Sequence, residues 1–596
     1  MEKIHKKSLC NNWGSSIFFI ANLLNFVLAT AVFTIPFPMH EVGIILGTII
    51  LTIICFISII ACTFIIEALA LKNSILKQEN IIFNEILPEN ERESITTTDK
   101  EEKDKEKKEE DIKEEKKGDE IKEETEIEGE KRIKEDENKD KEKNEEEKDK
   151  EEEINEENKE EKEEKRDNGI VEENSISDNN KDNLEKNNKN NIISNEKKEN
   201  EEVLIVGVDD DEDFIERRNS LYISQRFEIS NLSNALPKVG YYFSVLTIIC
   251  YLYIGITSNG IIAGNNLKDI IGKSFNIDMP DYSYYIILIS FFIITIIIAL
   301  NNIKHLKKFS MFIIIMRFLI IFLIMGCCFY SMAEYGIADI KDIPKFDLSN
   351  ITVMIGNSLF VFMSHHSIPG MVENFTPQKR LVKLLIIGYI FSLFFIVLYS
   401  YVGIFAFSNP KYSCDKNHEF PIAIQSTFSS NFLGLPVIGY IINYYPMLNM
   451  ITSGMQLITL RNNILDTIGA CNKKLSDSLN FAEKKGFISL LKNFCFNTFV
   501  ALPPITIGLL LQNIQSLMKY FSSILGFLLM LIVPLIVVNR YRNIFYERKY
   551  EFTDLNRSFL KNNYGNRFII LMSIVIFSLI IYGFIKTSGN KTCVNE

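Results

Sequence analysis

Several features of soluble enzymes and secreted scaffolds are missing from this sequence of 596 residues. The ten cysteines form no C-x-x-C pair and no Cys/His spacing of the zinc type, so neither a disulfide framework nor a structural metal is expected. Most of them lie within apolar runs, where a thiol behaves as a small hydrophobic group. No H-E-x-x-H motif, nucleophile elbow or pair of catalytic carboxylates occurs in an apolar run. The sequence therefore predicts no enzyme and no cofactor.

Charged residues are scarce in the apolar runs and concentrated in one stretch. Residues 88–202 are almost all Glu, Lys, Asp and Asn and carry a net charge of about −20, against −12 for the whole chain. The remainder is strongly hydrophobic and net positive by about 9. The mean hydropathy of +0.06 and the pI of 5.4 therefore average two unlike materials. A soluble enzyme and a nucleic-acid binder are excluded, because the remainder consists mainly of apolar runs.

About eleven of these runs are long enough to cross a bilayer, which predicts an all-α integral membrane protein with about 11 transmembrane helices. The first run continues through Pro36 and lacks a small-residue cleavage site, so it predicts a membrane helix rather than a signal peptide. The expected spans cover residues 15–36, 43–70, 239–264, 284–302, 311–331, 352–369, 382–407, 434–460, 493–511, 518–538 and 567–586.

The distribution of Lys and Arg among the loops predicts the orientation. With the N-terminus in the cytosol, the cytosolic loops contain about three times as many Lys and Arg residues as the opposite loops. Eleven spans then place the C-terminus outside the cell or in a lumen. The sequons at Asn350 and Asn590 fall on that side and are candidate glycosylation sites. Both the plasma membrane and an endolysosomal or vacuolar membrane fit this topology.

The acidic stretch divides the chain into three parts. Residues 1–87 contain the N-terminal tail and the first two spans, residues 88–202 form a cytosolic insertion, and residues 203–596 complete the membrane body. The insertion contains too little apolar surface to offset the entropy of ordering, so disorder is expected. Two interpretations of the insertion remain. It binds a cytosolic partner, or it is a solvated segment without a specific role.

The first span contains polar and small residues at membrane depth. Asn25 lies one turn before Ala29, Thr30 and Ala31, and Pro36 stands at the end of the span. A break at residues 29–31 would free backbone groups that bind a solute or an ion. The alternative is an intact helix whose polar side chains pack against neighbouring helices.

The sixth span carries a second set of helix-breaking residues. Gly356, Asn357 and Ser358 lie in its first half, and Ser364-His-His-Ser-Ile-Pro-Gly lies in its second half. Successive helical residues point about 100° apart, so His365 and His366 cannot face one site equally. One of them is a candidate to carry a coupling proton, and the alternative is that both are structural.

The first and sixth spans are five apart, which is the spacing of matching helices in a five-plus-five inverted repeat. Matching breaks in two such halves are typical of a substrate site in a secondary transporter. We therefore expect the substrate to contact residues from both spans, namely Asn25, Ala29, Thr30, Ala31, Asn357 and Ser358.

Other polar groups lie within the expected spans. Glu67 near the end of the second span and Arg317 in the fifth are interpreted as structural charges that reach the interface or pair within the protein. In the eighth span, the hydroxyls of Thr452 and Ser453 are candidate cation ligands facing the first span. Helix-to-helix hydrogen bonding explains them equally well.

Several stretches resemble the transmembrane protein 104 family within the amino acid/auxin permease group. The most specific are Phe362-Met-Ser-His-His-Ser-Ile-Pro369 and Thr459-Leu-Arg-Asn-Asn463, and the others are residues 25–36, 63–70 and 226–230. The resemblance implies a LeuT/APC-type fold with one helix beyond the repeat, and transport of amino acids or related solutes coupled to H⁺ or Na⁺. One difference is that Ala29-Thr30-Ala31 stands where permeases of this group have G-x-G.

Two functions follow from these observations. The first is a secondary active transporter of small solutes, amino acids above all, that works by alternating access in a lipid bilayer. The second is a membrane sensor or scaffold that keeps the permease fold and signals through the insertion.

Overall fold

The protein is described here by a computed structural model, which covers residues 2–86, 223, 227–277, 279–300, 303–372, 375, 378–413, 420–480, 486–548, 558 and 563–586. The chain divides into two compact units, one made of Met1–Glu79 with Val208–Glu596 and the other of Asn80–Gly207. The whole of the expected insertion at 88–202 lies outside the described residues. The first unit contains the membrane body.

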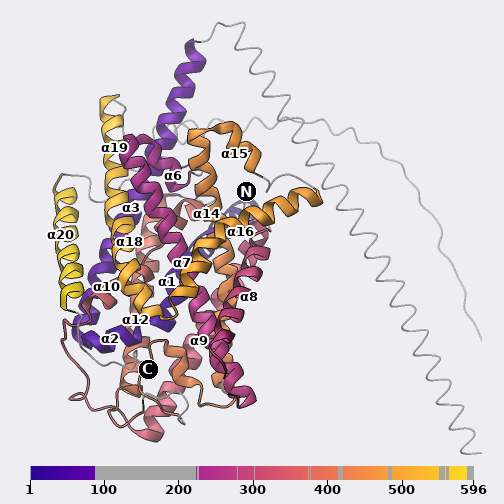
Figure 1. Ribbon diagram of the computed structural model, residues 1–596. Helices are drawn as coiled ribbons and strands as arrows, with labels where there is room; N and C mark the ends of the chain where they lie inside the picture. The colour runs from indigo at the N-terminus through magenta and orange to yellow at the C-terminus, as the bar shows by residue number, and fades with distance from the viewer. Residues whose placement is uncertain are drawn as a thin grey trace, which may run out of the picture. The chain divides into compact units, whose positions relative to one another are not determined.

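Every regular element in the described part of the first unit is a helix (Figure 1). The helices of the first half are α1 (Glu2–Thr34), α2 (Pro36–Val42), α3 (Ile44–Ile86), α6 (Ile229–Leu232), η2 (Ser233–Ala235), α7 (Lys238–Phe275), α8 (Tyr282–Ala299) and α9 (Ile303–Tyr335). The sixth span is divided into α10 (Ile351–Val361), η3 (His365–Ser367) and α11 (Ile368–Val372). It is followed by η4 (Gln378–Arg380), α12 (Leu381–Phe407) and η5 (Phe428–Phe432).

The remaining helices complete the bundle. They are α13 (Ile438–Tyr444), η6 (Tyr445–Leu448), α14 (Asn449–Cys471), α15 (Lys473–Leu479), α16 (Phe487–Leu510) and α20 (Asn563–Lys586). Between α16 and α20, one continuous helical run is made of α17 (Ile514–Leu517), η7 (Met518–Ser522), α18 (Ser523–Phe527), η8 (Leu528–Ile532) and α19 (Val533–Glu547), in which η7 and η8 are π-helical.

Ten of the helices or helical runs in the described residues are long and apolar enough to cross a membrane. They correspond to ten of the expected spans, and the prediction of an all-α integral membrane protein is confirmed. The expected span 434–460 is different, because α13, η6 and α14 replace a single apolar helix there. Pro446 interrupts the run, and Asn449 begins a more polar helix. The total of eleven spans remains a prediction.

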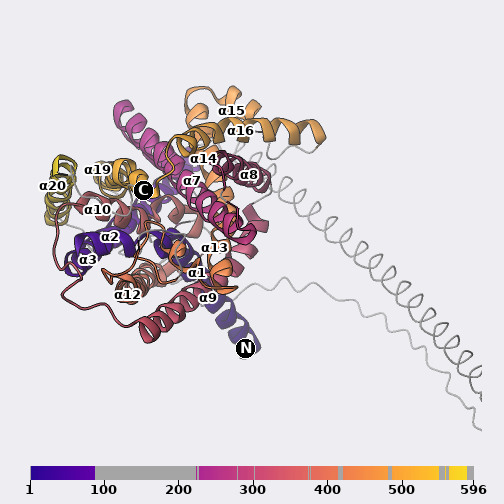
Figure 2. The same ribbon diagram turned by 60° about the horizontal axis from the view of Figure 1, so that its bottom comes forward.

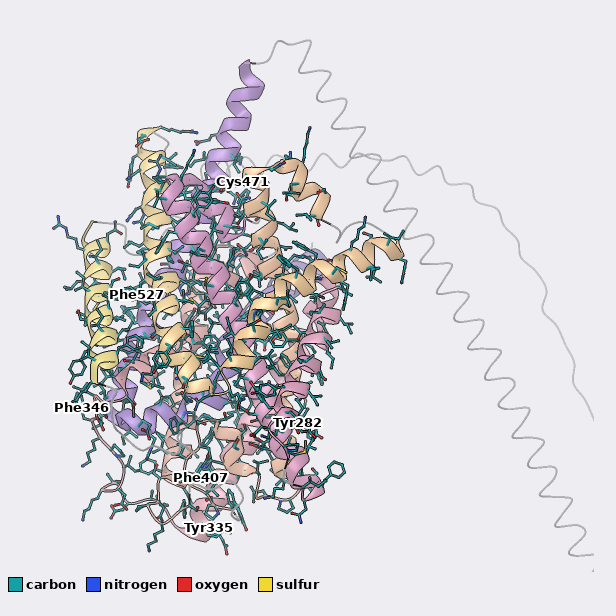
Figure 3. The ribbon with its side chains drawn as sticks, viewed as in Figure 1. Tyr282, Tyr335, Phe346, Phe407, Cys471 and Phe527 are labelled. Atoms are coloured by element: carbon teal, nitrogen blue, oxygen red, sulfur yellow. The ribbon has the colours of Figure 1, made fainter. Side chains whose placement is uncertain are left out.

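Two groups of helices make the closest contacts. In the first group, α1 packs against α9, α10 and α12. In the second group, α7, α8 and α14 pack against one another, and α16 covers α7 and α8. Viewed from the end of the bundle, α1 lies among the other helices rather than at the edge (Figure 2). The outer surface carries exposed large apolar side chains, among them Ile293, Phe322, Phe394 and Phe577, as expected for a surface in contact with lipid (Figure 3).

The end of the bundle near α2 is filled by aromatic side chains. Phe428 and Phe432 of η5 are buried, and both rings contact Phe407 at centroid distances of 5.9 and 5.4 Å. The Asn431 side chain donates to the carbonyl oxygens of Ile422 and Ala423, so the loop before η5 is held inside the bundle. This end is therefore closed in the structure.

The loop before α10 is fixed by one aspartate outside the spans. The amide of Ser349 donates to Asp347 at 2.8 Å, and the Ser349 hydroxyl also donates to this carboxylate. These bonds lower the pKa of Asp347 below its usual value, because they favour the charged carboxylate.

Candidate functional site

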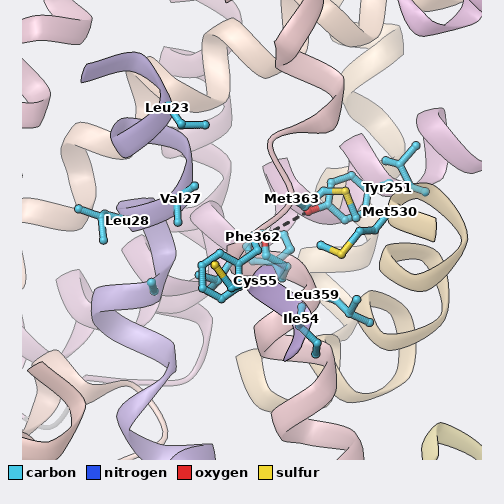
Figure 4. Close-up of a cluster of buried hydrophobic side chains, with 14 of the residues drawn as sticks. Leu23, Val27, Leu28, Ile54, Cys55, Tyr251, Leu359, Phe362, Met363 and Met530 are labelled. Atoms are coloured by element: carbon cyan, nitrogen blue, oxygen red, sulfur yellow. Dashed lines mark hydrogen bonds between the residues drawn. The ribbon is translucent and has the colours of Figure 1, made fainter. Parts of the chain in front are cut away.

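The sixth span is broken, as the sequence predicts. The α-helix ends at Val361, residues 362–364 are not helical, and the chain resumes in η3 and α11. Figure 4 shows the chain leaving the helix at Phe362 and continuing as an irregular connection between two helical pieces. The break lies in the second of the two stretches expected to cause it, since Gly356, Asn357 and Ser358 remain within α10.

The backbone groups freed by this break have partners from two neighbouring helices. The carbonyl oxygen of Phe362 accepts hydrogen bonds from the Ser58 hydroxyl at 2.6 Å and from the Tyr389 hydroxyl at 3.1 Å. Tyr389 also bonds to the Ser364 hydroxyl at 2.6 Å, and Cys62 lies within bonding distance of Tyr389. An unsatisfied carbonyl in a membrane costs several kcal/mol. α3 and α12 therefore stabilise the break.

The first span has no break at residues 29–31, and that prediction is wrong. α1 is helical from Glu2 to Thr34, through all three residues. Alanine favours the helix and lacks the conformational freedom of glycine, so Ala29-Thr30-Ala31 does not open it. The helix ends at Thr34, two residues before Pro36, which has no amide N–H to continue the hydrogen-bond pattern. Ala31 is buried, and the side chains of Ala29 and Thr30 lie outside the described residues.

The two histidines of the sixth span face different surroundings, as their adjacent positions predict. His365 is completely buried. His366 is 5% exposed and lies between Phe26 of α1 and Tyr251 of α7, at ring-centroid distances of 5.8 and 6.0 Å. Neither ring has a hydrogen bond within 3.5 Å to the residues that the structure describes.

His366 also lines a cavity of about 70 Å³ between α1, α14 and the segment η3–α11. The cavity lies in the half of α1 that begins at residue 16, away from the closed end near α2. None of its lining residues is Asp, Glu, Lys or Arg. The polar ones are Asn22, His366, Ser367, Gln456 and Thr459, and the others are Phe18, Phe26, Gly370, Met371 and Met455.

Gln456 is the polar residue of this cavity that sequence reasoning missed. Its Oε1 atom is buried and has no hydrogen-bond donor among the described residues. It follows Thr452 by one helical turn, so the polar positions 449, 452, 456 and 459 on α14 indicate one polar face. That spacing is the signal that could have identified it.

Of the expected substrate residues whose side chains the structure describes, none lines this cavity. Asn357 donates to Gln515 Oε1 at 2.9 Å, and Gln515 in turn donates to the carbonyl oxygens of Thr34 and Ser426. Ser358 donates to Met354 within its own helix. Asn357 therefore joins α10 to α17, whereas the Ser358 bond stays within α10. Asn25 is one turn beyond Asn22 but contacts Arg317 instead of lining the cavity.

Arg317 joins three parts of the bundle at membrane depth. Its guanidinium donates to the carbonyl oxygen of Asn25 and, at 2.6 Å, to the Asn25 side chain. It also donates to Tyr445 at 2.8 Å and to Asn449 at 3.2 Å. No carboxylate contacts it in the described part of the chain. Arg317 is completely buried, so its charge is stabilised by neutral oxygen atoms from α1, η6 and α14.

The candidate cation ligands Thr452 and Ser453 follow Asn449 on α14, and Asn449 accepts a hydrogen bond from Arg317. Ser453 accepts a hydrogen bond from Asn259 of α7 at 3.1 Å, which is a helix-to-helix contact. The Thr452 hydroxyl is buried and has no hydrogen-bond partner among the residues described. Arg317 therefore occupies the region between α1 and α14 where a bound cation was expected.

Glu67 pairs within the protein and does not reach the interface. It is completely buried and accepts two hydrogen bonds from Arg542 of α19, at 2.9 and 2.6 Å. The amide of Ser558 adds a third at 3.1 Å. Sequence reasoning missed Arg542, because it was assigned to a basic loop after the tenth span. Glu67 and Arg542 are far apart in the sequence, so no spacing pattern indicated that they form a pair.

The glycosylation candidates lie in different parts of the chain. Asn350 is half-buried just before α10, and its amide donates to Glu41 at 2.9 Å. Thr352 of the same sequon is buried. Asn590 lies outside the described residues.

Comparison with known proteins decides the family. The sequence model for the transmembrane amino acid transporter protein matches residues 232–586, which is more than half of the chain. The chain belongs to this transmembrane amino acid transporter family. Its matched region includes the broken sixth span, the cavity residues of α14 and Arg542.

Curated relatives agree with this assignment. The chain is 25% identical over 377 residues to a transmembrane protein 104 homolog of Dictyostelium discoideum, covering 61% of this chain and 72% of that protein. It is 24% identical over 197 residues to the Drosophila melanogaster homolog and 20% identical over 201 residues to human transmembrane protein 104, spanning 36% of each. The resemblance read from the sequence motifs is confirmed. The protein is a multi-pass membrane protein of the amino acid transporter type.

Proposed function

We propose that the protein is a secondary active transporter of amino acids or related small solutes, and that its substrate binds in the cavity between α1, η3–α11 and α14. The observation that carries this proposal concerns His366. Its ring is buried, has no hydrogen-bond partner among the described residues and lines the cavity at the broken span. Buried polar groups without partners are expensive, so a bound solute that supplies those hydrogen bonds gains affinity from them.

The lining of the cavity favours a small uncharged or zwitterionic solute. Gln456 offers a buried acceptor oxygen without a donor, and Phe18, Phe26 and Met371 offer apolar surface. No lining residue supplies a charge to pair with a charged side chain of a substrate, and a buried charge without a partner costs several kcal/mol.

Proton coupling fits the surroundings of this site better than sodium coupling. The guanidinium of Arg317 bonds to Asn449, one helical turn before Thr452. A buried positive charge near this turn of α14 disfavours a second cation at Thr452, because like charges repel more strongly in a medium of low dielectric constant. Proton coupling through His366 requires no set of cation ligands, and imidazole is the side chain that titrates nearest to neutral pH.

Transport by alternating access then requires the two packing groups to move relative to each other. The first group contains α1, α10 and α12, and the second contains α7, α8 and α14. The cavity lies between them, and the opposite end is closed by η5. We assign the cavity end to the cytosol, from the positive charge of the loops that would lie there.

Uptake into proteoliposomes tests this function. Labelled amino acid mixtures are supplied with a pH gradient, with a sodium gradient or with neither. We expect uptake driven by the pH gradient, and His366→Gln to reduce it at least tenfold, because the imidazole acts at the cavity. His365→Gln is the matched control for folding, since His365 does not line the cavity. Equal uptake by both variants and the unchanged protein would exclude the proposed role of His366.

Gln456 provides an independent test at the same site. We expect Gln456→Leu to raise the KM for uptake at least fivefold, because the acceptor oxygen is removed. Gln512→Leu is its control, because Gln512 is exposed and bonds to Tyr285 at 2.9 Å on α8. A KM change of the same size in both variants would show that the effect is not local to the cavity.

A second function is favoured by one observation. The unbroken α1 removes the helix break that would bind a substrate carboxylate, which fits a permease-fold sensor that signals through residues 88–202. In that case no solute gradient drives uptake, while a small solute still raises the melting temperature of the protein. Uptake and thermal stabilisation measured with the same solutes separate the two functions.

A further inference from the structure

The residues that follow the acidic stretch in the sequence are tied to one end of the bundle at several points. We call the described residues 223 and 227–235 the strap. It includes Ile223, α6 and η2, and it leads directly into α7 at Lys238. The elements that hold it are α3, η4, α14 and α19. Of these, α14 belongs to the second packing group, and η4 packs against α12 of the first.

Gln378 of η4 holds the strap at its beginning. Its Nε2 donates to the Ile223 carbonyl oxygen at 2.7 Å, and its Oε1 accepts from the Ile223 amide at 2.9 Å. Both main-chain groups of one residue are therefore bound by one side chain. The Ile223 side chain is 2% exposed, so it occupies an apolar site of its own within the core.

Lys72 of α3 holds the middle of the strap. Its ammonium group donates to the Asn231 carbonyl oxygen at 2.9 Å and also to the Asn231 side chain. The same group lies 4.1 Å from the centre of the Phe227 ring, which is a cation–π contact. Near the end of the strap, Arg540 of α19 donates to the Ala235 carbonyl oxygen at 3.0 Å.

The remaining contact joins the strap to the second packing group. The Ser230 hydroxyl donates to Asp466 of α14 at 3.3 Å. α6 also packs against both α14 and α7, which pack extensively against each other. The strap therefore belongs with α7 and α14, while Gln378, Lys72 and Arg540 fasten it to elements outside that group.

The fastening points are close in sequence to the walls of the cavity. Asp466 follows the cavity residue Thr459 by seven residues, which is about two turns and about 10 Å along the same face of α14. Gln378 follows Met371 by seven residues, after the end of α11. α3 is joined to α12 by the hydrogen bonds of Ser58 and Thr48 to tyrosines of α12. Separation of the two walls therefore pulls on the hydrogen bonds that hold the strap.

We propose that the strap is a latch on the cavity: its bonds to Gln378 and Lys72 hold the two packing groups together, and they must break for the cavity walls to separate. The role of the latch in transport rests on the proposed function. Its effect on the separation of the cavity walls does not. Since the strap follows the acidic stretch in the chain, a partner that binds the stretch can act on the latch through the connecting residues.

Cross-linking tests the latch, in a background where the cysteines at positions 10, 414, 471, 495 and 593 are serine. Ile223→Cys with Gln378→Cys is joined by a short reducible bis-thiol reagent. The matched control is Ser230→Cys with Asp466→Cys, which joins the strap to its own packing group. We expect the first cross-link to lower uptake at least tenfold, with recovery after reduction, and the control cross-link to lower it less than twofold. Full uptake by the first cross-linked protein would overturn the proposal.

A second measurement does not depend on transport. Met371→Cys in the same background is labelled by a maleimide in nanodiscs, because Met371 lies on a wall of the cavity and separation of the walls exposes its side chain further. We expect labelling to fall at least fivefold when residues 223 and 378 are cross-linked, and to rise at least threefold in Gln378→Leu. If the unchanged protein transports no solute, but labelling falls in the cross-linked protein and rises in Gln378→Leu, the proposed function is wrong and the latch is supported. Labelling at one rate in all three proteins would refute the latch.

Discussion

At the scale of single residues, the buried polar side chains of the bundle bind partners that are far away in the sequence, as Arg317 does with Asn25 and Asn449. The adjacent histidines predicted two unlike environments, and one of them lines the cavity. The partners of Arg317 were not predicted, because Asn25, Tyr445 and Asn449 are separated from it by more than a hundred residues. The spacing of residues in a sequence identifies only those neighbours that lie along the same helix. Contacts between helices depend on a packing arrangement that the pattern does not contain.

Arg317 is expected to be essential for folding of the bundle. Arg317→Gln leaves buried oxygen atoms of α1, η6 and α14 without donors, and hydrogen bonds to charged groups contribute about 1.5–3 kcal/mol each. We expect a lower melting temperature in detergent and less monodisperse protein. Arg317→Lys keeps the charge but not the fork of donors, so it should recover only part of the stability. Full stability in Arg317→Gln would contradict the structural role.

The pair of Glu67 and Arg542 makes a different prediction. Arg542→Met leaves a completely buried carboxylate without its cation, which costs about 3–5 kcal/mol. The double variant Glu67→Leu with Arg542→Met removes both charges, so it should be more stable than Arg542→Met alone. Thermal unfolding of the three proteins measures the difference. A double variant no more stable than the single one would show that the pair is not the source of the loss.

At the scale of helices, length and apolar character predicted the spans, and local chemistry predicted the break at residues 362–364. The same kind of reasoning gave a wrong break in α1, because membrane depth and polar side chains do not by themselves open a helix. The decisive difference is that α1 has alanines at positions 29 and 31. In the sixth span, the freed carbonyl of Phe362 is bound by Ser58 and Tyr389.

Close packing of α10 against η7 gives a prediction for one glycine. A Cβ atom on Gly356 would collide with the Met518 carbonyl oxygen, which is backbone and cannot turn away. We expect Gly356→Ala to push the helices apart and to lower the yield of folded protein severalfold. Gly326→Ala is the control, because nothing lies within 4 Å of a Cβ atom there. Size-exclusion chromatography of both variants provides the measurement, and equal yields would contradict the packing.

At the scale of the whole molecule, the membrane body and the acidic stretch were separated by composition alone. Charge and apolar content change abruptly near residue 88, and entropy opposes ordering of a chain with so few apolar groups. The arrangement of helices was not available from the same pattern. It rests on contacts such as Thr48 with Tyr401, whose residues are 353 positions apart.

Removal of residues 88–202 tests whether the body folds without them. We expect the shortened protein to reach the membrane and to unfold within a few degrees of the full chain, because the strap and all described ties of the bundle lie outside the deletion. Its uptake should match that of the full chain when no partner is present. Loss of the folded body would show that the acidic stretch contributes to its stability.

The pairing of Glu67 with Arg542 also sets an order of events during synthesis. The two residues are 475 positions apart, so the second helix emerges from the ribosome long before its arginine. Until then, a carboxylate that ends completely buried has no arginine to pair with. A chain that ends before residue 542 is therefore expected not to complete the packing of its second helix.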